Sequence, residues 1–185
     1  MFTIKPAKGR LLIAEPFLKD PNFIRSVILL CEVQKAGCFG FVINKLADST
    51  LGDLVTGLEH LSVPVYYGGP VQDTTLHFLH TYPELIKGGF PITENVFWGG
   101  DFEIATALIT SGKISTEGIR FYLGYSGWEE NQLQEELKEG SWVVSKSNKE
   151  IIFLPEVNQI WKEALLAKGG DYKLLINAPI DPQLN

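Results

Sequence analysis

Between Arg120 and Trp142 the sequence reads RFYLGYSGWEENQLQEELKEGSW, and three structural patterns follow one another in it without a spacer. Residues 119–125 are mostly aromatic or otherwise β-prone, which is typical of a buried or half-buried strand. The Ser126-Gly127 pair that follows predicts a turn at the end of this strand. We therefore expect the chain to leave the sheet at this point.

An amphipathic helix is expected directly after the turn. Leu133 and Leu137 are four residues apart and share a helical face with Trp128 or Glu129 one turn earlier. Gly140 is the residue type that commonly ends a helix. The stretch therefore predicts a strand, a turn with aromatic side chains and a helix.

Length and composition indicate a globular protein and exclude some classes of partner. The chain has 185 residues, of which 45% are hydrophobic and 21% are charged, so a single domain over residues 1–185 is expected. Its formal net charge is −6. Binding to phosphate backbones draws its affinity from Lys and Arg, so this charge disfavours a nucleic-acid-binding function.

The N-terminal region and the cysteines suggest a location inside the cell. The apolar run from Leu11 to Ala14 ends at Glu15-Pro16, which is too short for a signal peptide and far too short for a membrane span. Cys31 and Cys38 fall on one expected hairpin, diagonal to each other and beyond easy disulfide reach. We expect two reduced thiols and a cytoplasmic protein that does not contact a membrane.

The centre of the sheet is expected at a hairpin formed by residues 27–33 and 38–44. Both segments are almost continuously apolar, as strands are when both faces of their sheet are covered. The connection between them, Gln34-Lys35-Ala36-Gly37, has the length of a hairpin loop. Residues 27–30 and 39–43 are therefore predicted to be almost wholly buried.

Strands and helices are interspersed along the rest of the chain. Several strand pairs have connections too short for parallel crossovers, which predicts an α+β fold with a mixed, mainly antiparallel sheet. The further elements expected are a helix from Ser49-Thr50 to His60, strands at 65–71, 76–81 and 96–98, a helix capped by Asp101 with Ile104, Leu108 and Ile109 inward, a hairpin of 142–144 with 151–153, and a last helix from Pro155 to Gly169-Gly170.

Several motifs together resemble the YqgE/AlgH family. They are Gly9 to Asn44, Gly68-Gly69-Pro70-Val71, Leu79-His80, Gly99-Gly100-Asp101 and residues 120–142. The resemblance implies a single α+β domain in which a strongly bent, mixed sheet curls into a barrel-like core flanked by helices. It implies little about activity, because the family's label of transcriptional regulator rests on a link to alginate production in one lineage.

The chain departs from the family pattern at three places. Val33 stands where the family usually has His, Lys45-Leu46 replaces an Arg-Pro pair after Asn44, and Ser126 replaces an Ala. A histidine and an arginine that could do chemistry are therefore missing here, which argues against catalysis at these positions.

No residue set specifies a reaction, so no catalytic residue, metal ligand or cofactor is predicted. His77 and His80 are three residues apart on an expected strand, which sends their side chains to opposite faces. Ser126 lacks the glycine spacing of a nucleophile elbow. The glycine loops at 68–70 and 99–101 lack the lysine-hydroxyl pair of a phosphate-binding loop, so they are expected to be structural turns.

A binding surface is the remaining candidate site. Arg25 directly precedes the central strand, and Tyr125 and Trp128 close another strand, so we expect both groups to meet at one end of the sheet. Side chains that combine an aromatic ring or a long stem with a polar group are suited to recognition. The alternative is structural, with Trp128 as a lid on the core and Arg25 as an ion-paired strap. The candidate residues are Arg25, Asn44, Tyr125, Trp128 and Gln132.

Three classes of function follow from these features. The leading hypothesis is a non-catalytic cytoplasmic regulatory or interaction protein that acts through a protein partner or a small ligand. The alternative is an enzyme, or a protein that binds a small anion or nucleotide, with a cleft near Arg25, His80 and Asp101. Direct DNA binding is the least favoured, because the only cationic cluster is Lys5, Lys8 and Arg10.

Overall fold

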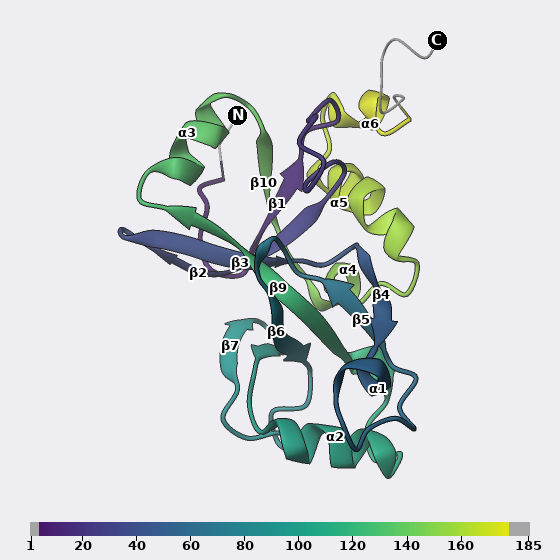
Figure 1. Ribbon diagram of the computed structural model, residues 1–185. Coiled ribbons are helices and arrows are strands. Elements are labelled where there is room, and N and C mark those ends of the chain that lie inside the picture. Colours follow the sequence, from purple (N-terminus) through teal and green to yellow (C-terminus); the bar gives the residue numbers. More distant parts are fainter. Residues whose placement is uncertain (1–3, 178–185) are drawn as a thin grey trace.

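One long strand, β9 (Ile119–Glu129), runs through the middle of the molecule and joins two groups of strands (Figure 1). The computed structural model describes residues 4–177. Within them a ten-stranded sheet has the order β10-β1-β2-β3-β9-β6-β8-β7, with β5 on β9 and β4 on β5 as a branch. All pairings are antiparallel except β5 with β9, so the sheet is mixed and mainly antiparallel, as predicted.

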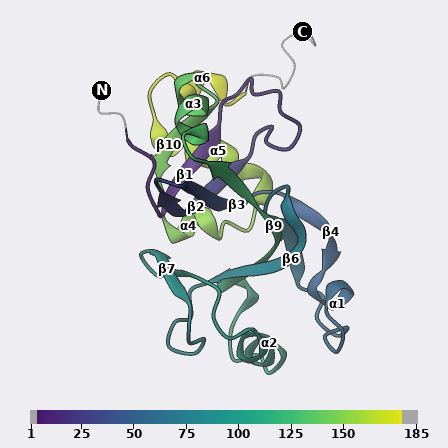
Figure 2. The same cartoon turned by 60° about the vertical axis from the view of Figure 1, so that its left-hand side comes forward.

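The two ends of β9 pair with different strands, and this bends the sheet. Its C-terminal part, Ser126 to Glu129, pairs with β3, while its N-terminal part pairs with β5 on one side and β6 on the other. The result is the curled, half-barrel α+β architecture that the sequence and the resemblance predict (Figure 2). The other strands are β1 (Arg10–Ala14), β2 (Val27–Gln34), β3 (Gly37–Val42), β4 (Leu46–Thr50), β5 (Pro64–Tyr67), β6 (Val71–His80), β7 (Phe90–Thr93), β8 (Val96–Trp98) and β10 (Trp142–Lys146).

Helices cover the sheet from separate sides. In Figure 1, α5 and α3 flank the half that contains β1 and β2, and α2 covers the other half. The helices are α1 (Leu51–Leu54), α2 (Phe102–Thr110), α3 (Gln132–Lys138), α4 (Lys149–Ile152), α5 (Ile160–Lys168) and α6 (Tyr172–Leu175), with short 3-10 turns at Thr116–Gly118 and Val157–Gln159. None of these helices is long and apolar enough to cross a membrane.

The predicted central hairpin is confirmed, and its two faces belong to different cores. Val27 and Leu29 pack with Trp161 of α5, while Ile28 and Leu30 pack with Leu133 of α3. All four strand residues are fully buried, because helices cover both faces. Residues 40–43 are buried as well, and Phe39 is the one exception, since its ring is only half-buried.

The predicted turn at Ser126-Gly127 is wrong. The β-strand continues through these residues to Glu129, because the backbone of Gly37 to Gly40 pairs with them across the sheet. Trp128 therefore lies on a strand opposite Cys38, and the helix starts only at Gln132. Pairing with β3 therefore extends β9 four residues beyond the end that local β-propensity predicts.

The predicted hairpin of residues 142–144 with 151–153 is also wrong. β10 pairs with β1 instead, and residues 149–152 form α4, which starts where the Asn148 side chain accepts a hydrogen bond from the Ile151 amide. The apolar triplet Ile151-Ile152-Phe153 is too short for its period to distinguish helix from strand.

Other boundaries differ in smaller ways. The helix expected from Thr50 to His60 is a single capped turn, because the chain is already extended at Val55. Asp101 caps α2 as predicted, but Ile104 is 41% exposed and Ala105 and Thr106 face the core in its place. The short strands β4 and β7 escaped prediction, since their sequences LADST and FPIT are polar or contain proline.

Candidate functional site

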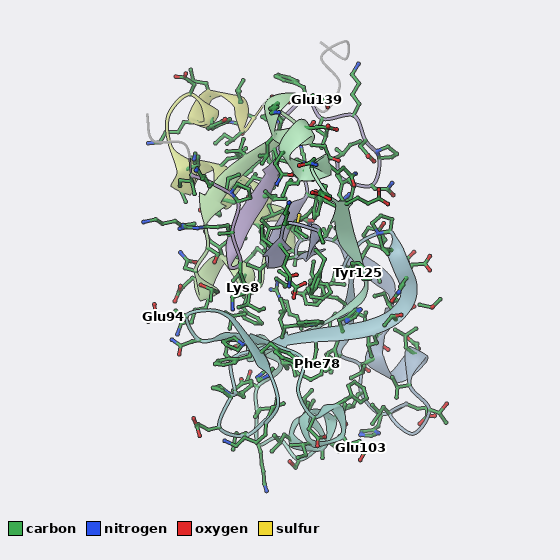
Figure 3. The ribbon with its side chains drawn as sticks, turned by 90° about the vertical axis from the view of Figure 1, so that its left-hand side faces the viewer. Lys8, Phe78, Glu94, Glu103, Tyr125 and Glu139 are labelled. Carbon is green, nitrogen blue, oxygen red and sulfur yellow. The ribbon has the colours of Figure 1, made fainter. Side chains whose placement is uncertain are left out.

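A pocket of about 710 Å³ opens between the β2–β3 hairpin, the end of β9 and the strands β6 and β8. A volume in this range suits a small organic ligand. Figure 3 shows Tyr125, one of its lining residues, near the middle of the molecule where the two groups of strands meet. The lining residues are Glu32, Gln34, Ala36, Gly37, Cys38, Phe39, Val71, His77, Trp98, Tyr125, Gly127, Trp128, Glu129 and Gln132.

Four rings form a closed circuit in this pocket. They are Phe39, Trp98, His77 and Tyr125, one from each of the strands β3, β8, β6 and β9. The ring centroids are 5.0 Å apart for Phe39 and Trp98, and 6.2 Å apart for Trp98 and His77. His77 and Tyr125 are separated by 6.1 Å, and Tyr125 and Phe39 by 5.8 Å.

The sheet itself creates this circuit. The four strands are consecutive in the sheet order β3-β9-β6-β8, although they are far apart in the chain. All four rings are partly exposed, so they line the pocket while they also pack on one another. Rings in tilted or edge-to-face contact hold their positions, which makes this a preformed aromatic wall.

The charged groups at the pocket are carboxylates. Glu32 and Glu129 are both exposed lining residues, and no Lys or Arg of the described part of the chain lines the pocket. Burial lowers the pKa of His77, so its ring is neutral at pH 7. The His77 Nε2 atom is buried and has no hydrogen-bond partner among the described residues.

Cys38 is the one thiol that lines the pocket. Burial, and to a lesser degree the charge of Glu136, raise the pKa of this thiol to about 11. It is therefore protonated at pH 7 and a poor nucleophile. Cys31 on the other strand of the hairpin is buried, and both cysteines are free thiols, as predicted.

Trp128 is part of the core beside the pocket rather than an exposed anchor. Its side chain is 6% exposed, and its indole Nε1 donates to Glu136 Oε2 over 2.8 Å. The Trp142 indole donates to the same oxygen over 2.7 Å, and the Gln132 amide donates to the other oxygen over 3.0 Å. Glu136 therefore ties two tryptophans to α3.

Arg25 and Asn44 lie elsewhere, so the five predicted surface residues do not form one group. The Asn44 amide donates to the Arg25 carbonyl over 2.9 Å and accepts from the Val27 amide over 2.8 Å. The Arg25 guanidinium lies 4.9 Å from the centre of the Trp161 ring on α5. Neither residue lines the pocket, whereas Tyr125, Trp128 and Gln132 do.

The residues of the enzymatic alternative do not converge. His80 is fully buried, its Nδ1 accepts from the Tyr82 amide over 3.1 Å, and its Nε2 lies 3.0 Å from the Gly99 carbonyl. Asp101 accepts from the Ile104 amide at the start of α2. Both groups have structural partners, and Arg25 packs against α5 in the other half of the sheet.

No metal site is formed by the part of the chain that the structure describes, in which no group of three or more His, Cys, Asp or Glu side chains could hold an ion. As expected for a strand, His77 and His80 face opposite sides. His77 faces the pocket, and His80 stacks on Phe97 at a centroid distance of 5.8 Å.

Of the four rings in the circuit, only that of Tyr125 belongs to a predicted site residue, and those of Phe39, His77 and Trp98 were missed from sequence. In sequence Phe39 and Trp98 have the pattern of ordinary core residues of short strands, and only the strand order brings them together.

Arg120 was missed as well, although an arginine inside an apolar strand indicates a buried cation that needs hydrogen-bond partners. It is buried, donates to the carbonyls of Ile152 and Leu154 over 2.9 and 2.6 Å, and thereby ties the chain after α4 to β9.

The fold and the pocket define an α+β protein with a curled sheet and an aromatic, carboxylate-rimmed pocket. The AlgH-like family model matches residues 11–173, and the chain belongs to this family. It is 41% identical over 179 residues to the UPF0301 protein of Cytophaga hutchinsonii, with 96% of this chain and 98% of the relative covered. The UPF0301 protein of Chlorobium limicola is 40% identical over 177 residues, with 96% and 95% covered.

Solved structures show the same fold. The AlgH protein from Pseudomonas aeruginosa is similar with a TM-score of 0.72 and 26% identity, over 97% of this chain and 98% of that protein. Protein DIP2367 from Corynebacterium diphtheriae has a TM-score of 0.74 at 20% identity, over 96% and 95% of the two chains.

Proposed function

We propose that this protein is a non-catalytic regulatory or interaction protein of the cytoplasm that acts by binding a small ligand in the aromatic pocket. The observation that carries the proposal is the pocket itself, in which four strands each contribute one ring to a preformed wall. Largely preformed concave sites with aromatic walls and a few polar groups are typical of ligand binding.

The chemistry of the pocket supports binding rather than catalysis. The Cys38 thiol is protonated at neutral pH, and the His77 ring has no hydrogen-bonded partner among the described residues that could orient it as a base. A nucleophile activated by an adjacent base is thus missing from the lining residues. Two free thiols support the cytoplasmic location, because reducing compartments maintain them.

Charge argues against DNA as the partner. The net charge is −6, and Lys8 in the small basic cluster already donates to the Pro91 carbonyl over 3.0 Å. We expect no salt-dependent binding to duplex DNA at micromolar protein in a mobility-shift titration. A steep dependence of binding on salt concentration would contradict this.

The proposal is tested by equilibrating the protein with a metabolite extract of its native host and identifying retained molecules by mass spectrometry. The wild type should retain at least one compound that the Tyr125→Leu variant does not, because the variant keeps an apolar side chain but loses the ring. Phe17→Leu is the matched control, since Phe17 is 40% exposed and does not line the pocket. Equal retention by all three proteins would contradict the proposal.

A further inference from the structure

We propose that the ligand of the aromatic pocket is a small organic cation, specifically a substituted or quaternary ammonium compound. The inference rests on the proposed function and adds the chemical class of the ligand. It follows from three features of the pocket, namely the arrangement of its rings, the sign of its charges and its volume.

The rings supply the first argument. The faces of Trp, Tyr and Phe rings carry negative electrostatic potential and attract a cation within about 6 Å of the ring centre. Phe39, Trp98 and Tyr125 all line the pocket, and Phe39 lies 5.0 Å from Trp98 and 5.8 Å from Tyr125. An alkylated ammonium group can therefore contact more than one ring at once, and its methyl groups bury apolar surface against them.

The charges supply the second argument. Among residues 4–177, Glu32 and Glu129 line the pocket and no cationic side chain does. His77 and Cys38, the other titratable groups named above, are both neutral at pH 7. A cationic ligand would thus meet two carboxylates and no like charge, whereas an anion would be repelled.

A metal ion fits the pocket poorly. Hard cations need six or more oxygen ligands or several waters held by carboxylates, and zinc needs four ligands of the His, Cys and carboxylate type. No suitable group of ligands occurs within residues 4–177. A volume of about 710 Å³ is also far larger than one ion requires and suits an organic molecule.

The first experiment compares choline with its uncharged isostere 3,3-dimethylbutan-1-ol by NMR titration of the isotope-labelled protein. The two probes have nearly the same shape, so the difference between them reports the charge. Choline should bind about tenfold more tightly, which corresponds to about 1.4 kcal/mol and lies in the range of cation–π contacts.

Two pairs of variants locate the effect. Tyr125→Phe keeps the ring and should bind choline as the wild type does, whereas Tyr125→Leu should weaken binding severalfold. The double change Glu32→Gln with Glu129→Gln should also weaken choline binding and leave the neutral isostere unaffected. Its control, Glu94→Gln with Glu103→Gln, changes the net charge equally, and Figure 3 shows both residues away from Tyr125.

The outcomes separate this inference from the proposed function. Equal binding of choline and the isostere, or a loss of choline binding in both double variants, would overturn the inference. The proposed function would survive if a neutral or anionic compound from the extract were retained in a Tyr125-dependent manner. Preferential choline binding that depends on Tyr125, Glu32 and Glu129 supports both.

Discussion

Trp128 is buried in the core, and its one polar group, the indole N–H, donates to the Glu136 carboxylate. On β9 it faces Leu133 and Trp142, and its indole N–H needs the Glu136 carboxylate as a partner because it is buried. One carboxylate that accepts from two indoles and an amide explains why α3 docks where it does.

Replacing Trp128 by Ala should lower the free energy of unfolding by about 3–5 kcal/mol, because a buried aromatic side chain is lost and a cavity remains. Gln132→Ala is the neighbouring control and should change it by about 0.5 kcal/mol or less, since the side chain is exposed. Denaturant titration measures both. A nearly neutral Trp128→Ala variant would mean that the tryptophan is not part of the core.

His80 should make stability fall in mildly acidic solution. Burial lowers the pKa of His80 below its ordinary value of 6.5, although the hydrogen bond to Gly99 opposes this in part. Above about pH 6.5 the side chain is neutral in both states, and its contribution is fully present. As the pH falls below this value, the unfolded state takes up the proton first, and stability is lost until the folded-state pKa is passed.

Unfolding free energies measured between pH 7.5 and pH 5 check this prediction in the wild type and a His80→Gln variant. The wild-type curve should fall more steeply toward low pH than that of the variant, which cannot take up this proton. The comparison is needed because burial also lowers the pKa of His77, which acts in the same direction. Parallel curves would contradict the assignment to His80.

At the scale of elements, β9 organises the molecule. Its C-terminal end pairs with β3, and its N-terminal part pairs with β5 and β6. This pairing brings side chains of β3 and β6 to one surface beside β9. The β2–β3 hairpin is the other organising element, because helices cover both of its faces. The two elements meet where Cys38 lies opposite Trp128, and this is where the pocket opens.

Leu29→Ala should lower the free energy of unfolding by about 2–5 kcal/mol, because Leu29 is fully buried in the middle of β2. Leu46→Ala is the matched control on another strand, since Leu46 is 55% exposed, and it should change stability by about 0.5 kcal/mol or less. A cost below about 1 kcal/mol for Leu29→Ala would show that the hairpin is not the centre of the sheet.

Across the whole molecule, sequence patterns predicted those features of the fold that depend on residues close together in the chain. The apolar hairpin, the Asp101 cap of α2 and the α+β class follow from periodicity, capping and short connections. The strand boundary near Trp128 and the helix at residues 149–152 did not, because β9 pairs with Gly37 to Gly40 and β10 pairs with β1 rather than with residues 151–153. The predictions failed where pairing with a strand distant in sequence determined which of two locally acceptable conformations forms.

The candidate site was only half visible for the same reason. Tyr125 and Gln132 were picked out near one another in sequence, and both line the pocket. Phe39, His77 and Trp98 join them only through the order β3-β9-β6-β8, which no local pattern contains. Arg25 and Asn44 lie at the other end of the central hairpin. There the Asn44 side chain holds the start of β2 through its hydrogen bonds to the Arg25 carbonyl and the Val27 amide.

Ligand binding in the aromatic pocket can be located by mapping chemical-shift changes of the isotope-labelled protein on addition of a mixture of cationic, neutral and anionic fragments. We expect the largest changes on the Trp98 indole and on the amides of Phe39, His77 and Tyr125. Changes centred instead on Arg25, Asn44 and Trp161 would contradict it. So would fragments that bind without disturbing any residue of the pocket.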